Sequence, residues 1–146
     1  MTGLFDRWQM KFNKEIPVFG DESYRGDCKK EDLEAMDFYS WLKLNHPEHA
    51  EFYIHPKVEG KRTYGQVNYE KKTGGMPKST PDGIIMHAIP FCVELKRKDH
   101  TISKWQDGQQ EKLIGLSKRG CFVGVALGAD GMKEAFLKWL EIINRQ

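Results

Sequence analysis

Apolar residues recur at helical spacing in two long segments of the 146-residue chain. Residues 29–45 carry a broad apolar face, and residues 132–143 repeat apolar positions at steps of three and four. Asp27 and Asp130 each precede one of these segments and are candidate N-caps. The pattern therefore predicts one helix early in the chain and one at its end.

Four shorter apolar runs of strand length lie between these helices. They are "EFYIH" at 51–55, "GIIMH" at 83–87, "FCVELK" at 91–96 and "CFVGVAL" at 121–127. A third helix is predicted over residues 107–119, because Gly120 follows as a helix stop. The order αβββαβα predicts an α/β fold with a central mixed sheet flanked by helices.

Two segments show little periodicity. Residues 1–26 are predicted to form an irregular N-terminal extension with a short helix near Phe5–Phe12, ahead of a single domain at 27–146. Residues 56–80 are rich in Gly, Lys and Thr, and a stretch of this length without periodicity is more often functional than structural.

Composition limits the class of protein. A chain of 146 residues is the usual size of one domain. Three cysteines at wide spacings favour reduced thiols over disulfides or a zinc site. No apolar run approaches the roughly 18 residues of a membrane helix, and no signal-peptide core is present at the start. We therefore expect a cytoplasmic protein without a membrane partner.

Charge is distributed unevenly along the chain, although its net value is only +2. Residues 1–50 carry seven basic and ten acidic side chains, whereas residues 57–78 carry six basic and two acidic ones. Residues 94–119 carry seven basic and four acidic ones. Basic zones of this kind suit a polyanion such as nucleic acid, and a merely solvated surface is the plainer reading of charge alone.

Three charged residues stand in or beside strand-like sequence. Glu94 and Lys96 share one face of their predicted strand, because alternate side chains point the same way. A hairpin centred on Ala88 would place Asp82 opposite Glu94, about 5 Å apart at Cβ. Two carboxylates this close repel each other, and a divalent cation such as Mg²⁺ or Mn²⁺ relieves the conflict. A turn aspartate and an exposed strand face remain the alternative for these residues taken alone.

The motifs around these residues resemble the PD-(D/E)XK nuclease signature, and more closely its VRR-NUC branch. "TPDGII" and "FCVELK" carry the acids and the lysine, and "GQQEKLIGLSKRGCFVGVALGADGMKEAFLKWL" continues the series. The resemblance covers residues 31–142. It implies a restriction-endonuclease-like core and metal-dependent cleavage of DNA, with a preference for branched or junction structures. It also implies homodimers, which are frequent in the branch.

The resemblance assigns roles to five residues. It implies that Asp82 and Glu94 bind Mg²⁺ or Mn²⁺, that Lys96 is the catalytic lysine, and that Gln109 contacts the site from the next helix. An acid from the first helix often completes the metal set, and we expect Glu34 rather than Glu31, because Glu34 lies on the core-facing stripe.

The sequence departs from the family pattern in two places. The segment between "ELK" and Gln109 is a few residues longer than usual, which weakens the assignment of Gln109. The late strand reads "FVGVAL", without the Val-Arg-Arg-like residues that name the branch.

The basic segments predict the DNA path. The residues expected to contact DNA are Lys61, Arg62, Lys78, Arg97, Lys98 and Lys104. The competing interpretation is a non-catalytic DNA-binding protein that retains a nuclease-like fold. A small-molecule phosphohydrolase is less favoured, because the chain has no GxxxxGK phosphate loop.

Overall fold

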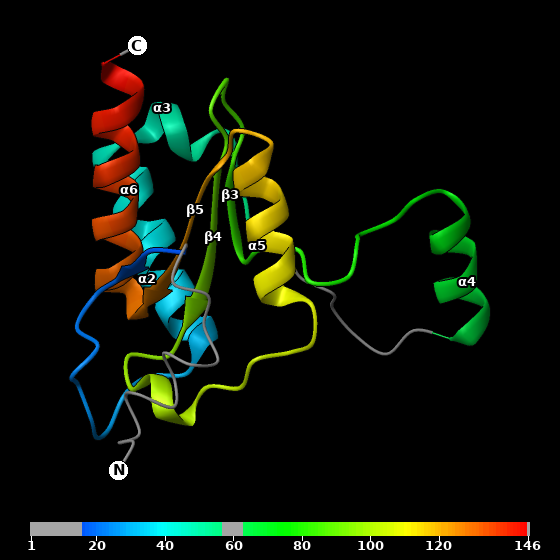
Figure 1. The fold of residues 1–146 in the computed structure, drawn as a ribbon, viewed down its shortest axis with the longest axis horizontal. Coiled ribbons are helices and arrows are strands. Elements are labelled where there is room, and N and C mark those ends of the chain that lie inside the picture. The colour runs from blue at the N-terminus through cyan, green and yellow to red at the C-terminus, as the bar shows by residue number, and fades with distance from the viewer. Residues whose placement is uncertain (1–15, 57–62, 146) are drawn as a thin grey trace.

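The computed structural model describes residues 16–56 and 63–145. Its centre is a five-stranded mixed sheet with the order β1-β5-β4-β3-β2 (Figure 1). The strands are β1 Val18–Phe19, β2 Tyr53–Ile54, β3 Gly83–Ile85, β4 Phe91–Lys96 and β5 Phe122–Leu127. The pairs β1–β5 and β5–β4 are parallel, and the pairs β4–β3 and β3–β2 are antiparallel.

Helices cover both faces of this sheet. The helices of the described residues are α2 Glu31–Asn45, α3 Pro47–Ala50, α4 Tyr64–Lys72, α5 Gln109–Lys118 and α6 Gly128–Asn144, with a 3₁₀ turn, η1, at His100–Ile102. α2 and α6 lie together on one face, and α5 lies on the other (Figure 1). The predicted α/β class with a mixed sheet and flanking helices is confirmed, and the predicted order αβββαβα is contained in the observed one.

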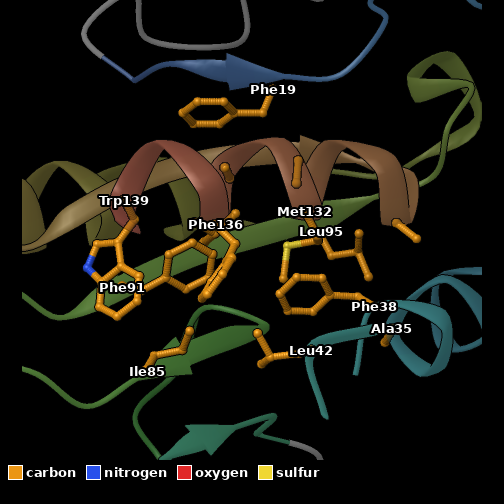
Figure 2. Close-up of a cluster of buried hydrophobic side chains, with 14 of the residues drawn as sticks. Phe19, Ala35, Phe38, Leu42, Ile85, Phe91, Leu95, Met132, Phe136 and Trp139 are labelled. Atoms are coloured by element: carbon orange, nitrogen blue, oxygen red, sulfur yellow. The ribbon is translucent and has the colours of Figure 1, made fainter. Parts of the chain in front are cut away.

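Aromatic side chains fill the larger core, between α2, α6 and the sheet. Phe91, Phe136 and Trp139 gather at one end of it, as Figure 2 shows. Trp139 is fully buried, and its Nε1 donates to the carbonyl oxygen of Ile89 at 2.8 Å. A smaller cluster around Leu113 and Val125 seats α5 on the opposite face. The sheet is thus fixed from both sides, which holds the carboxyl end of β4 in place.

The β3–β4 hairpin has the register expected from a turn centred on Ala88. Gly83 pairs with Val93, and Ile85 pairs with Phe91. Asp82 therefore lies one position beyond the ladder, on the side of Glu94. Oδ2 of Asp82 accepts a hydrogen bond from the Leu95 amide at 2.9 Å, which fixes its carboxylate at the end of the hairpin.

The N-terminal segment joins the domain instead of preceding it. Its described part, residues 16–26, supplies β1, which extends the sheet beside β5. Ile16 and Phe19 are buried in the two core clusters. The helix expected near Phe5–Phe12 lies outside the described residues.

Both predicted helix caps are wrong. α2 begins at Glu31 after Lys30, without a side-chain cap from Asp27. α6 begins at Gly128, so Asp130 lies within its first turn instead of capping it. The Ala129 amide at that end donates to the Glu34 carboxylate, an acceptor from another helix that local sequence does not reveal.

Residues 56–80, expected to lack regular structure, contain the helix α4. Thr63 and Gln66 form a capping box, in which each side chain accepts from the other residue's backbone N–H. Lys71 and Lys72 occupy the last turn, where cations favour the helix dipole. α4 has no buried residue and stands apart from the rest of the fold (Figure 1). Among the described residues, no helix is long and apolar enough to cross a membrane.

Candidate active site

A polar cavity of about 480 Å³ opens where β3 begins and β4 ends. The start of α2 and the start of α5 complete its walls, together with the segment 76–80. The cavity is lined by Glu31, Met76, Pro77, Lys78, Ser79, Thr80, Asp82, Glu94, Lys96, Lys104, Gln106 and Gln109. The structure therefore brings together four of the five residues that the sequence assigned to the site.

Glu94, Lys96 and Gln109 form one buried network. Glu94 and Lys96 are 2% and 3% exposed, so these two charged side chains are almost fully removed from water. Gln109 Nε2 donates to Glu94 Oε1 at 3.1 Å, and Gln109 Oε1 accepts from Lys96 Nζ at 3.1 Å. The Lys96 Nζ to Glu94 Oε1 distance is 3.9 Å. Gln109 thus bridges the acid and the base.

Gln109 occupies the position that the resemblance implied, at the first residue of α5. Gly108 precedes it with φ of +89°, a left-handed conformation that favours glycine. The Gln106 amide also donates to Gln109 Oε1 at 3.0 Å. The longer segment before α5 therefore leaves Gln109 at the site.

Lys96 is fixed by three contacts besides Glu94. Its Nζ donates to the Lys104 carbonyl oxygen at 2.8 Å and to Gln109, and lies 4.4 Å from the centre of the Trp105 ring. A cation over an indole face is stabilised by the ring quadrupole. These contacts hold the ammonium group at the cavity wall in a single orientation.

Two acids of the cavity, Glu94 and Glu31, have raised pKa values. Burial, followed by the hydrogen bond and charge of Asp82, raises the pKa of Glu94 from 4.5 to about 10. Burial is also the main reason that the pKa of Glu31 is raised, and Asp82 adds to it. Lys96 opposes both shifts without cancelling them. Burial and the neighbouring Asp82 therefore outweigh the nearby Lys96 ammonium in their effect on the pKa values of Glu94 and Glu31.

The residues present fit a divalent cation. Oε2 of Glu94 is buried and has no hydrogen-bond partner among the described residues. This orphaned oxygen is the atom that a cation between Glu94 and Asp82 would satisfy. Within the described ranges, no three His, Cys, Asp or Glu side chains converge as a ready-made ligand set. Mg²⁺ is usually held by one or two carboxylates and keeps several waters, so two acids are sufficient.

The helix acid at this cavity is Glu31, and the structure does not bring Glu34 to it. Glu34 is 8% exposed, and its carboxylate accepts from the Ala129 amide at the start of α6. Glu31 lines the cavity at the first position of α2, and its Oε1 accepts from Ser103 Oγ at 3.4 Å. The core-facing position of Glu34, which suggested a site role, instead serves helix capping.

The residues expected to contact DNA lie in different places. Lys78 and Lys104 are exposed and line the cavity. Arg97 Nη2 donates to the Cys28 carbonyl oxygen at 2.9 Å, and Lys98 Nζ lies 4.3 Å from the Tyr24 ring centre, so both side chains contact the chain that precedes α2. Lys61 and Arg62 lie outside the described residues.

The segment 76–80 was missed as part of the site. Ser79 has φ of +66°, which is uncommon for a residue with a side chain, and its Oγ donates to the Asp107 carbonyl oxygen at 3.0 Å. This contact fastens the segment to the loop before α5. Its place just before the "PD" pair was the available signal.

The fold is shared with a solved structure of a VRR_NUC domain protein. The two match with a TM-score of 0.63 and 20% sequence identity, over 81% of this chain and 92% of that chain. The likeness confirms the predicted restriction-endonuclease-like fold. No family model matches the sequence, and no curated protein matches it.

Proposed function

We propose that this chain is a metal-dependent DNA endonuclease. The proposal is based on the fold that it shares with a VRR_NUC domain protein and on the acids at the end of its own β3–β4 hairpin. The observation that carries the proposal is the buried Glu94–Gln109–Lys96 network beside Asp82, with one Glu94 oxygen left unsatisfied. Burying such a set of charges costs free energy of folding, so its presence supports a functional role. Perturbed pKa values in a cleft are typical of functional sites.

Asp82 and Glu94 would hold Mg²⁺ or Mn²⁺, with Glu31 as the third acid of the site. The cation would neutralise the acids, polarise a phosphodiester oxygen and lower the pKa of a bound water. Gln109 orients Glu94 through its amide nitrogen, so that the second carboxylate oxygen stays directed away from that bond. Asp82 is oriented by the Leu95 amide.

Lys96 would stabilise the negative charge that develops on phosphate oxygens. Its ammonium group is already positioned by Lys104, Gln109 and Trp105, so little reorganisation is needed during the reaction. Retention of both acids and the lysine together favours catalysis over a purely DNA-binding role.

The exposed cations of the cavity support a polymeric substrate. Lys78 and Lys104 stand at its wall, and Lys71 and Lys72 lie on α4, which precedes the segment 76–80 in the chain. Phosphates on either side of a scissile bond would engage these side chains. We propose selectivity for branched or junction DNA on the resemblance to the VRR-NUC branch.

The test is a cleavage panel on labelled four-way junction, flap, single-stranded and duplex DNA with Mg²⁺, Mn²⁺ or EDTA. We expect cutting with either cation, none with EDTA, and faster cutting of branched than of fully paired DNA. The Asp82→Ala protein is the matched control for a contaminating nuclease. Absence of cation-dependent cutting from every substrate would overturn the proposal.

A further inference from the structure

A second cavity, of about 310 Å³, lies in the groove between α2 and the edge strand β2. It is lined by Asp32, Ala35, Met36, Tyr39, Tyr53 and His55. Its volume is at the lower end of small-molecule sites, which span about 300–1,000 Å³. No residue of this cavity lines the polar cavity described above.

The two cavities are joined through Asp82. His55 Nδ1 lies 2.6 Å from the Asp82 carbonyl oxygen. The Tyr53 ring covers the next residue, where a Cβ on Gly83 would lie 3.4 Å from the Tyr53 hydroxyl. The charge of Asp82 also contributes to a raised pKa of the Tyr53 hydroxyl, although burial is the larger cause. A residue that lines the second cavity, His55, therefore contacts the residue that carries one of the two proposed metal-site acids.

The lining chemistry fits a flat ring rather than a phosphate. Tyr39 stacks on Tyr53 with ring centres 5.6 Å apart, and Met36 adds a wall that is 64% exposed. No Lys or Arg in the described part of the chain lines the cavity, and Asp32 would repel an anion. Lys43 Nζ lies 4.6 Å from the Tyr39 ring centre, so a cation stands beside the aromatic wall. An apolar aromatic slot with polar groups at its edge suits a nucleobase, and the neighbouring cation suits the attached backbone.

We propose that this cavity holds the base of an unpaired nucleotide adjoining the scissile phosphate. The inference rests on the proposed nuclease function and deepens it, because it names what makes a substrate suitable. A base stacked in a duplex cannot enter the slot without being unpaired and turned out of the helix, which costs energy. A flap, or a junction with an unpaired nucleotide at its branch point, offers such a base at no such cost. The slot therefore selects branched DNA without reading its sequence.

The test is a binding cycle on flap DNA in Ca²⁺, measured by fluorescence anisotropy. A set of flaps carries one abasic nucleotide, moved stepwise through the positions around the branch. We expect one position at which removal of the base weakens binding to the wild-type protein about tenfold, the scale of one base stacked on an aromatic side chain. Tyr39→Ala should weaken binding to the intact flap by a similar factor and leave the abasic flap unaffected. Tyr39→Phe keeps the ring and should behave as wild type.

Met36→Ser gives a second route, because Met36 is largely exposed and the change does not threaten the fold. We expect it to reduce the preference for the base-containing flap in the same direction. The inference would be overturned if the variants lost equal affinity for the intact and abasic flaps, or if no abasic position weakened binding. Cleavage of both kinds of flap would still leave the nuclease proposal standing. Failure of the wild-type protein to bind or cut any DNA would overturn both.

Discussion

The polar cavity and the helix α4 carry charge in opposite ways. In the cavity, Glu94 and Lys96 are almost fully buried and are each fixed by Gln109. On α4, Lys71 and Lys72 are exposed, and no residue of the helix is buried. The cavity therefore holds its charged groups in fixed positions, whereas the exposed lysine side chains of α4 can adjust to a binding partner.

This difference separates two tasks that one substrate imposes. The proposed bond cleavage would need groups preorganised around a single phosphate, and among the described residues the β3–β4 hairpin and α5 position such groups. Holding a long polyanion needs cations spread over a surface, and these gain little from rigidity. The segment 76–80 connects the two regions, because it follows α4 and lines the cavity.

The largest effect should come from the acids of the cavity. Asp82→Ala and Glu94→Ala should each reduce the single-turnover cleavage rate by at least about 100-fold, because neither leaves the carboxylate pair that holds the cation. Circular dichroism and thermal unfolding should show an intact fold, since the change relieves repulsion between acids. A variant that cuts at the wild-type rate in Mg²⁺ or Mn²⁺ would refute the metal assignment.

Glu31 and Glu34 offer a matched pair in the same helix. Glu31→Ala should lower the cleavage rate about tenfold or more and change the melting temperature little, because Glu31 lies at the cavity. Glu34→Ala should lower the free energy of unfolding by about 1–2 kcal/mol with cleavage retained, because it removes the acceptor of the Ala129 amide. The reverse result would return the site role to Glu34.

The basic segment should control salt dependence instead of chemistry. Neutralising Lys61, Arg62 and Lys78 to Gln should reduce the slope of log affinity against log salt by about one unit per true phosphate contact. Saturating DNA should restore most of the single-turnover rate, because the acids are untouched. Lys138→Gln, on α6 away from α4, is the control (Figure 1). An unchanged slope would move the DNA path toward Lys104 and the other cations of residues 97–119.

The smallest effect should be a shift in the stability of the metal-free protein. Because the pKa of Glu94 is raised in the folded protein, the folded chain keeps a proton between pH 4.5 and about 10 that the unfolded chain has already released. Stability should therefore fall as pH rises through that window. Glu94→Gln should flatten the dependence and raise the melting temperature at pH 9 by about 3–5 °C. Asp130→Asn, which changes an exposed acid, should leave the pH dependence of stability as in the wild type. Parallel curves of melting temperature against pH for Glu94→Gln and the wild type would contradict the role of Glu94.

The hairpin register and the core site were accessible from sequence because both follow local rules. Strand alternation places Glu94 and Lys96 on one face, and a short turn fixes which residue meets Asp82. Gln109 was assigned through the family resemblance, and the helix predicted over residues 107–119 begins at Gln109 in the structure. These features depend on near neighbours in the chain or on a repeated motif.

The features that were missed depend on distant segments or on unused local signals. Glu34 lies on a core-facing stripe, and only the packing of α2 against α6 shows that its carboxylate reaches the Ala129 amide. The parallel pairing of β1 with β5 joins segments more than 100 residues apart in sequence. α4 was different, since its capping box was readable in "TYGQ" but was outweighed by the surrounding glycines and lysines.

The two-residue strand β1 also covers part of the edge of the sheet at β5. It occupies the open side of β5, and the Phe19 ring packs so closely there that a Cβ on Gly124 would lie only 2.6 Å from it. A protein shortened to begin at residue 27 would uncover the edge of β5 at Val125 and Ala126, the two residues that pair with β1. Exposed strand edges of this kind recruit other chains by backbone pairing. Loss of these few residues would therefore appear as self-association rather than as loss of chemistry.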